Sequence, residues 1–143
     1  MTKSYQVAAL PMRRAASGVL EVLLITTRGS RRWVVPKGWP WRNFSDQDAA
    51  AGEAWEEAGV RGTTSAVSIG SYSYRKRWNG AWRPLTVRVY VMEVTEEASA
   101  WPEAAERQRG WFALAVAAEL VAEAELKIIL LTFEQAAGLP AGA

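Results

Sequence analysis

The stretch Glu53-Ala54-Trp55-Glu56-Glu57-Ala58-Gly59-Val60 decides how this chain is interpreted. Its three carboxylates stand at positions i, i+3 and i+4, immediately before a glycine that can end a helix. At about 100° per residue, the three side chains project from one face of a helix. Like charges at this spacing destabilise a helix by a few tenths of a kcal/mol per pair unless a cation compensates them. Because clustered carboxylate oxygens suit Mg²⁺ or Mn²⁺, the stretch predicts a metal site on a helix.

Composition places the chain among globular proteins and excludes several kinds of catalysis. The 143 residues are 50% hydrophobic and 22% charged, and we expect residues 1–143 to form a single domain with a buried core. With no cysteine and no histidine, the chain lacks disulfides, thiol nucleophiles, histidine-ligated zinc and imidazole acid–base groups. The sequence has no run of about 18 apolar residues and no signal-peptide core, so we expect no membrane association and a cytoplasmic location.

The basic residues are unevenly distributed, although the net charge is only +2. One group occupies residues 28–42, where no acidic residue occurs: Arg28, Arg31, Arg32, Lys37 and Arg42. A second group surrounds a predicted hairpin: Arg75, Lys76, Arg77 and Arg83. These groups favour a polyanionic ligand, with solvated surface charge as the alternative interpretation. The low net charge and the lack of a nucleic-acid-binding motif predict no stable nucleic-acid partner.

Strand-like segments surround one central helix in the predicted order of elements. We expect strands over residues 19–26, 32–35, 66–74 and 85–94, a short strand or turn over 110–112, and a turn at 78–80. A helix is predicted over 46–58, between Ser45 as N-cap and Gly59 as C-cap, and another over 123–137. This order predicts an α+β fold, an α/β/α sandwich in which helices cover both faces of a mixed sheet. Residues 138–143 are expected to fray.

The carboxylate stretch and its lead-in resemble the signature of the Nudix hydrolases. Gly38 precedes Glu53 by 15 residues, as in that signature, and the match continues to Val60. A second resemblance, to the diphosphoinositol polyphosphate phosphohydrolase branch and its bacterial relatives, lies in the segment RWVVPKGWP, which runs from Arg32 to Pro40. Fainter similarity extends from residues 13–16 to residues 109–112. The resemblance implies the Nudix fold and Mg²⁺- or Mn²⁺-dependent hydrolysis of a phosphoanhydride bond in a small polyphosphorylated molecule.

The resemblance also implies roles for particular residues. The catalytic metal ligands would be Glu53, Glu56 and Glu57, with the Gly38 carbonyl as a further ligand. The general base stays open between one of these glutamates and an acid from a distant loop. Our candidates for binding phosphate are Arg13, Arg14, Arg32, Lys37, Arg83 and Arg109. Two loop tryptophans either stack on a nucleobase or cover the core: Trp39 and Trp41.

Two positions depart from the signature. Gly52 stands where the family has an arginine, and Phe44 stands where it has its first glutamate. In the family the arginine orients the catalytic glutamates, and loss of such a partner commonly reduces metal affinity or activity by about 10–100-fold. We therefore expect a weakened site and faster turnover in a Gly52→Arg variant. Phe44 is expected to matter less, because its position lies in the loop.

Three functions remain open at this point. The first is cleavage of diphosphoinositol or diadenosine polyphosphates. The second is a nucleotide-directed pyrophosphatase acting on nucleoside triphosphates, nucleotide sugars or the 5′ end of RNA. The third is a Nudix-fold module that binds a phosphorylated ligand without cleaving it, for which Gly52 is the support. The chain is expected to be a monomer or a homodimer.

Overall fold

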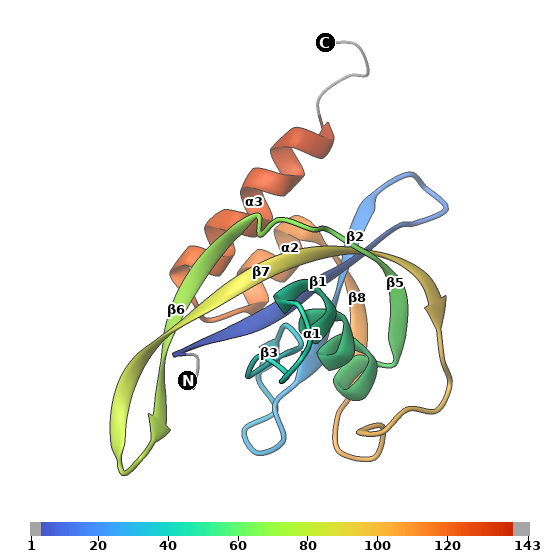
Figure 1. Ribbon diagram of the computed structural model, residues 1–143. Helices are drawn as coiled ribbons and strands as arrows, with labels where there is room; N and C mark the ends of the chain where they lie inside the picture. Colours follow the sequence, from blue (N-terminus) through green and yellow to red (C-terminus); the bar gives the residue numbers. More distant parts are fainter. Residues whose placement is uncertain (1–3, 139–143) are drawn as a thin grey trace.

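A mixed β-sheet lies between two layers of helices in the computed structural model, which describes residues 4–138 (Figure 1). The sheet has the strand order β3-β2-β1-β7-β5, with β4, β6 and β8 paired to β1, β7 and β2. The elements are β1 (Tyr5–Arg14), β2 (Leu20–Thr26), β3 (Trp33–Val34), β4 (Lys37–Gly38), α1 (Asp46–Glu53), the π-helix η1 (Ala54–Ala58), β5 (Val60–Thr64), β6 (Gly70–Trp78), β7 (Ala81–Glu97), β8 (Arg109–Ala113), α2 (Leu114–Leu120) and α3 (Ala124–Gly138).

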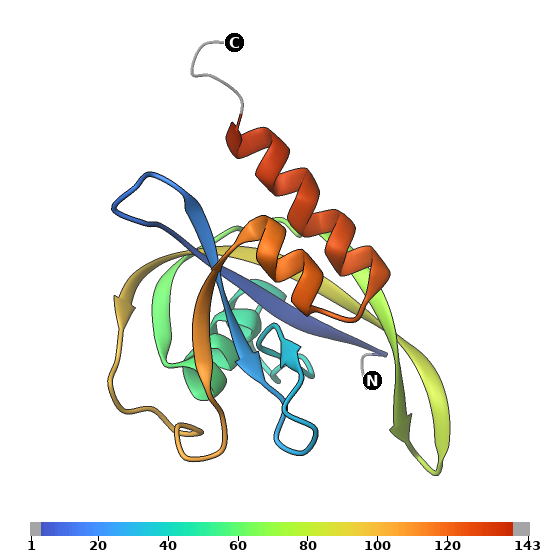
Figure 2. The same ribbon diagram turned by 180° about the vertical axis from the view of Figure 1, so that it is seen from behind.

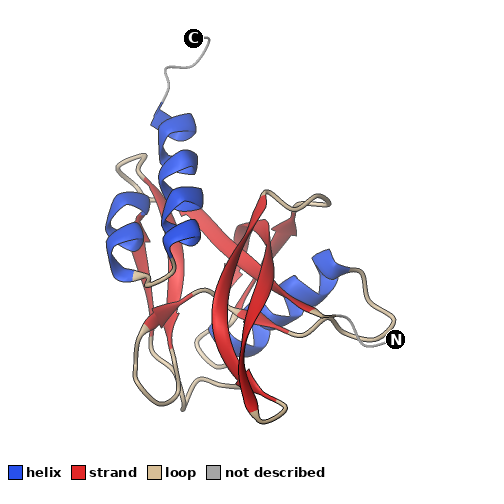
Figure 3. Ribbon diagram, turned by 90° about the vertical axis from the view of Figure 1, so that its left-hand side faces the viewer, coloured by secondary structure: helices blue, strands red, loops and turns tan. Residues whose placement is uncertain are grey.

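Each face of the sheet has its own hydrophobic core. On one face, α1 and η1 pack through Ala50, Ala54 and Ala58, none of which has any exposed surface. On the other face, α2 and α3 cover the sheet, and Leu126 and Leu130 of α3 are fully buried there. Figure 2 shows α2 and α3 in front of the sheet, and Figure 3 shows α1 and α3 on opposite sides of it. The predicted mixed sheet with helices on both faces is therefore confirmed.

Strand β1 runs through the middle of the sheet. It is parallel to β7, from the pair Tyr5–Thr86 to the pair Met12–Glu93, and antiparallel to β2 and β4. Strands β6 and β7 continue past the sheet as a long hairpin, which extends to the lower left of Figure 1. Asn79 and Gly80 close this hairpin with φ angles of 50° and 76°. Two consecutive positive φ angles are those of a type I′ turn, which confirms the turn predicted at residues 78–80.

The predicted helix over 46–58 forms, but in two parts. Helix α1 starts after Ser45, whose hydroxyl accepts a hydrogen bond from the Asp48 N–H at 3.0 Å. From Ala54 to Ala58 the chain becomes a π-helix, which ends at Gly59 with a left-handed φ of 70°. A π turn is wider than an α turn and is frequent at functional sites. Glu56 and Glu57 therefore do not project at the spacing of the ideal α-helix that we assumed.

Four elements were not predicted, namely β1, β4, β5 and α2, and one strand was misplaced. β5 has a single buried residue, Val60, and α2 is only seven residues long, so neither gives a periodic hydrophobic signal. The strand expected over 66–74 begins at Gly70 and continues to Trp78. Apart from Gly138, the tail expected to fray lies outside the described residues. Within residues 4–138, no helix has the length and apolar character needed to cross a bilayer.

The end of η1 generates a stability prediction. An added Cβ at Gly59 would lie 2.7 Å from an Arg109 nitrogen and from the Trp101 ring, whereas at Gly80 it would meet nothing within 4 Å. We expect Gly80→Ala to cost about 1 kcal/mol of unfolding free energy from backbone conformation alone. Gly59→Ala should cost about 2–4 kcal/mol, because overpacking adds to the same term.

Urea denaturation of both variants measures the difference. Equal losses of unfolding free energy in Gly59→Ala and Gly80→Ala would show that the close contacts around Gly59 add no cost to the substitution.

Candidate active site

Glu57 is a carboxylate held almost entirely out of water, with 8% of its surface exposed. One of its oxygens accepts a hydrogen bond from the Lys37 backbone N–H at 3.2 Å, and the other lies 3.6 Å from the Arg107 guanidinium. Burial raises the pKa of Glu57 to about 8, with a further contribution from Glu53, although Arg107 acts in the opposite direction. A cation placed at this carboxylate would offset much of the cost of its burial.

The Glu53 side chain lies beside Glu57 and interacts with it. Burial raises the pKa of Glu53, although the Trp41 indole N–H, which donates to Oε1 at 3.0 Å, acts in the opposite direction. The carboxylate also rests on the backbone of Gly38, where an added Cβ would lie 2.8 Å from Oε2 and closer to two other atoms of the group. A glycine at 38 is thus required by the position of Glu53. The structure brings Gly38, Glu53 and Glu57 together.

Arg107 and Glu103 belong to the same site, and neither was predicted from the sequence. Arg107 Nε donates to Glu103 at 2.8 Å, and its Nη1 donates to the Thr26 carbonyl at 3.0 Å. The Glu103 backbone N–H donates to the Glu56 carbonyl at 3.0 Å, which fixes the loop after β7 against η1. The only sequence signal was an acid four residues before an arginine, which is common in any chain.

The donor chemistry at Glu53 and Glu57 fits a hard divalent cation. Within residues 4–138, no three acidic side chains converge closely enough to enclose a metal by themselves, and Arg107 contacts both Glu57 and Glu103. Mg²⁺ does not need such a cage, because it usually keeps several waters and takes one or two protein carboxylates plus substrate phosphates. Glu56 contributes negative charge next to Glu53, which also favours a cation.

A cleft of about 320 Å³ opens beside Glu57 and is rich in cations. The residues that matter for its chemistry are Arg28, Lys37, Trp39, Tyr74, Lys76 and Arg107. The Lys37 ammonium lies 4.9 Å from the centre of the Tyr74 ring. Burial lowers the pKa of Lys37, although Glu57 opposes that shift. Four cationic side chains and one carboxylate line this cleft, so it is suited to an anionic ligand.

The predicted phosphate-binding residues divide according to their distance from this cleft. Lys37 lines it, and Arg83 pairs across the hairpin with Lys76, which also lines it. Arg83 Nε donates to the Trp78 carbonyl at 3.3 Å. Arg32 lies in the exposed loop before β3, where its Nε donates to Ser30 at 3.2 Å, and it does not line the cleft.

Arg109 has a structural position instead of the phosphate-binding one that we expected. Its guanidinium donates to the carbonyl of Ala58 at 2.9 Å and to that of Ala98 at 2.5 Å, and it lies 3.9 Å from the centre of the Trp101 ring. These contacts engage both terminal nitrogens of the guanidinium and join the end of η1 to the loop after β7. The expected role is corrected for this reason.

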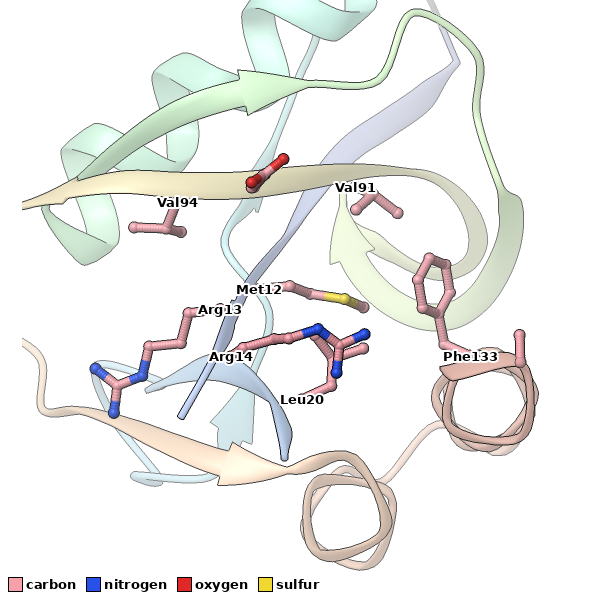
Figure 4. Close-up of a pocket in the computed structure, with 9 residues that line it drawn as sticks. Met12, Arg13, Arg14, Leu20, Val91, Val94 and Phe133 are labelled. Carbon is pink, nitrogen blue, oxygen red and sulfur yellow. The ribbon is translucent and has the colours of Figure 1, made fainter. Parts of the chain in front are cut away.

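Arg13 and Arg14 lie at the far end of β1, beside a groove between the sheet and α3 (Figure 4). Arg13 Nε donates to Glu21 at 3.0 Å, and Arg14 donates to the Gly18 carbonyl at 2.9 Å. Gly38 pairs with Val7 of the same strand, so Arg13 lies roughly 20 Å further along β1 at about 3.3 Å per residue. The structure therefore does not bring these arginines to the carboxylates.

The two loop tryptophans have different surroundings. Trp39 lines the cleft and meets Trp78 edge to face, with 5.4 Å between ring centroids. Trp41 does not line the cleft, because its ring lies against Gly52 on the helix. Only Trp39 is placed where a ligand in the cleft would meet it.

Known proteins share both this sequence pattern and this fold. Over 108 residues, the chain is 32% identical to Nudix hydrolase 12, mitochondrial, of Arabidopsis thaliana, an alignment that covers 71% of this chain and 52% of that protein. It is 34% identical over 95 residues to diphosphoinositol polyphosphate phosphohydrolase 2 of Rattus norvegicus, covering 64% of this chain and 49% of the relative. The chain thus spans about half the length of these relatives. No family model matches it.

The fold also has a solved counterpart. A C. elegans Ap4A hydrolase binary complex superposes with a TM-score of 0.68 and 19% identity, over 96% of this chain and 100% of that one. The mixed sheet with helices on both faces is therefore a fold already known from that hydrolase. The two sequence relatives and the glycine-to-glutamate spacing show that the chain belongs to the Nudix hydrolase family, and its fold agrees with this.

Proposed function

We propose that this chain is a Mg²⁺- or Mn²⁺-dependent pyrophosphohydrolase that cleaves a phosphoanhydride bond in a small polyphosphorylated molecule. The observation that carries the proposal is the interacting pair of Glu53 and Glu57, of which Glu57 lines a cleft rich in cations. Two adjacent carboxylates suit a divalent cation, and the neighbouring cations suit the phosphates that such a cation accompanies.

We assign different roles in the reaction to different residues of the site. A bound Mg²⁺ or Mn²⁺ would supply charge neutralisation of the phosphate oxygens and activation of water. Glu53 and Glu57 would hold it, with the Gly38 carbonyl alongside and Glu56 adding negative charge. Lys37 would bind and orient the phosphate next to Glu57, together with Arg107, which lines the same cleft. Glu103 is an acid from a distant loop that contacts Arg107, and we include it as the candidate general base.

Substrates with more than two phosphates are favoured by the cations farther from Glu57. Arg28 and Lys76 line the same cleft, and Arg83 is the cross-strand neighbour of Lys76. This distribution supports a diphosphoinositol polyphosphate or a diadenosine polyphosphate as substrate. The names of the rat relative and of the C. elegans structure fit these two classes.

A nucleotide-directed pyrophosphatase is the second candidate, and Trp39 favours it. The ring of Trp39 lines the cleft, where it is available to stack on a base. Competition between adenine-containing and inositol-based substrates separates the two candidates. Cleavage of nucleoside triphosphates or nucleotide sugars, with no cleavage of the polyphosphates, would favour the second. The cytoplasmic location and the monomeric or dimeric state stay predictions.

Replacing Glu57 tests the metal assignment. Glu57→Gln keeps the shape of the side chain but removes the charge, so we expect metal-dependent phosphate release to fall to background. The variant should keep its fold, because the amide fills the same space and Arg107 retains its ion pair with Glu103. Phosphate release with Mg²⁺, Mn²⁺ or chelator, and a thermal melt, measure both quantities.

Glu96→Gln is the control for this variant, because Glu96 is an exposed acid paired with Arg61 on the surface. It should leave both activity and stability unchanged. Retained activity in Glu57→Gln would refute the assignment of Glu57 as a metal ligand.

Two neighbouring basic residues on β6, Lys76 and Arg77, allow a test of how the phosphates farther from Glu57 are bound. Lys76 lines the cleft, whereas Arg77 is exposed and points to the opposite side of the strand. We expect Lys76→Ala to raise KM for the polyphosphorylated substrate by about 10-fold, the size of one lost charged hydrogen bond. Arg77→Ala removes the same charge from the same strand and should leave KM unchanged.

Steady-state kinetics of the two variants measures the difference. If both raise KM equally, the hairpin acts through its overall charge and not through contact in the cleft.

A further inference from the structure

The space above Gly52 is filled by an aromatic ring. A Cβ built at position 52 would lie 2.7 Å from two carbons of the Trp41 six-membered ring and still closer to a third. Any side chain at position 52 and the present position of Trp41 therefore exclude each other. A glycine inside a helix costs about 1 kcal/mol relative to alanine, so its presence here needs a reason, and the ring of Trp41 supplies one.

The same ring is hydrogen-bonded to the candidate metal site. Trp41 Nε1 donates to Glu53 Oε1 at 3.0 Å. An indole N–H can only donate, so it holds one oxygen of the carboxylate and leaves the other for a cation. On its other side, the Trp41 ring meets Phe44 at 5.3 Å between centroids, with an interplanar angle of 79°. Edge-to-face contacts of this kind contribute about 0.5–1.5 kcal/mol and fix the orientation of both rings.

Both departures from the Nudix signature therefore contact a single side chain. Gly52 replaces the signature arginine and makes room for the indole, and Phe44 replaces the first signature glutamate and packs against the indole. Neither substitution is explained by itself, but both are explained if Trp41 has taken over the contact to Glu53.

We propose that Trp41 is a positioning residue for Glu53 and replaces the arginine absent at position 52. Gly52 and Phe44 line the space that its ring occupies. This inference rests on the proposed metal-dependent function. It corrects two expectations drawn from the sequence. The site is not weakened by Gly52, because Glu53 has kept an orienting donor, and Gly52→Arg in the wild-type background would displace the indole and lower turnover.

The hydrogen bond from Trp41 to Glu53 is tested by Trp41→Phe, which keeps an aromatic ring between Gly52 and Phe44 but removes the N–H. We expect kcat to fall about 10-fold or more, the usual effect of losing a partner that orients a metal ligand. The Mn²⁺ concentration for half-maximal activity should rise by a similar factor, while KM for the substrate stays nearly unchanged. Direct Mn²⁺ binding, followed by the electron paramagnetic resonance signal of the free ion, should weaken equally. This last measurement does not depend on turnover.

Trp111→Phe is the matched control. Trp111 Nε1 donates to Glu97 Oε2 at 2.6 Å, so this variant deletes the same kind of hydrogen bond outside the site. It should change neither Mn²⁺ binding nor kcat.

The exchange with arginine is tested by a double variant. Trp41→Ala should be impaired through loss of the donor, and Gly52→Arg should be impaired because the indole would be displaced from its present position. Together, Trp41→Ala and Gly52→Arg make room for a guanidinium beside Glu53. The double variant should therefore bind Mn²⁺ more tightly and turn over faster than either single variant.

Specific results would overturn the inference. One is wild-type Mn²⁺ affinity and kcat in Trp41→Phe, and the other is a double variant no better than Trp41→Ala. If the wild type cleaves no substrate but Trp41→Phe still weakens Mn²⁺ binding, the proposed function fails and the role of Trp41 stands. If the wild type binds no Mn²⁺ at all, both are overturned.

Discussion

A carboxylate held out of water is the constraint on which the rest of this structure depends. Glu57 is buried with a raised pKa, and the chain surrounds it with a backbone N–H from β4, the Arg107 guanidinium and the neighbouring Glu53. Each contact requires an element at a particular place. β4 pairs with β1, the loop after β7 folds back onto η1, and the π turn places Glu57 inward. An arrangement that buries charge at this cost is expected where the charge has a function.

Local features of the site could be predicted from the sequence. Ser45 as N-cap and Gly59 as C-cap both follow from short-range spacing, and the structure contains both of them. Phosphate-binding residues could not be predicted in the same way. Charge alone does not reveal that both terminal nitrogens of Arg109 donate to backbone carbonyls, nor that Arg13 lies far along β1 from the carboxylates. Arg107 carried no distinguishing pattern, although it contacts Glu57 directly.

Departures from a signature have a different meaning once their contacts are known. Gly52 by itself suggests a lost arginine and a weaker site. In the folded chain it is one side of a contact with Trp41, whose N–H reaches the glutamate that the arginine would have oriented. Helix propensity and hydrophobic periodicity do not reveal such an exchange. Trp41 and Gly52 come into contact only because the loop between β4 and α1 folds onto the helix. The proposed role of Trp41 accounts for a site that lacks the arginine usually supporting it.

The most direct test of the central claim is a crystal of the protein soaked in Mn²⁺ and examined by anomalous scattering. A metal held by the Glu53 and Glu57 carboxylates predicts an anomalous peak within coordination distance of both groups, with the Arg107 guanidinium moved away from Glu57. No peak at these carboxylates at millimolar Mn²⁺, with Arg107 still in contact with Glu57, would contradict the claim that this pair of glutamates is a metal centre.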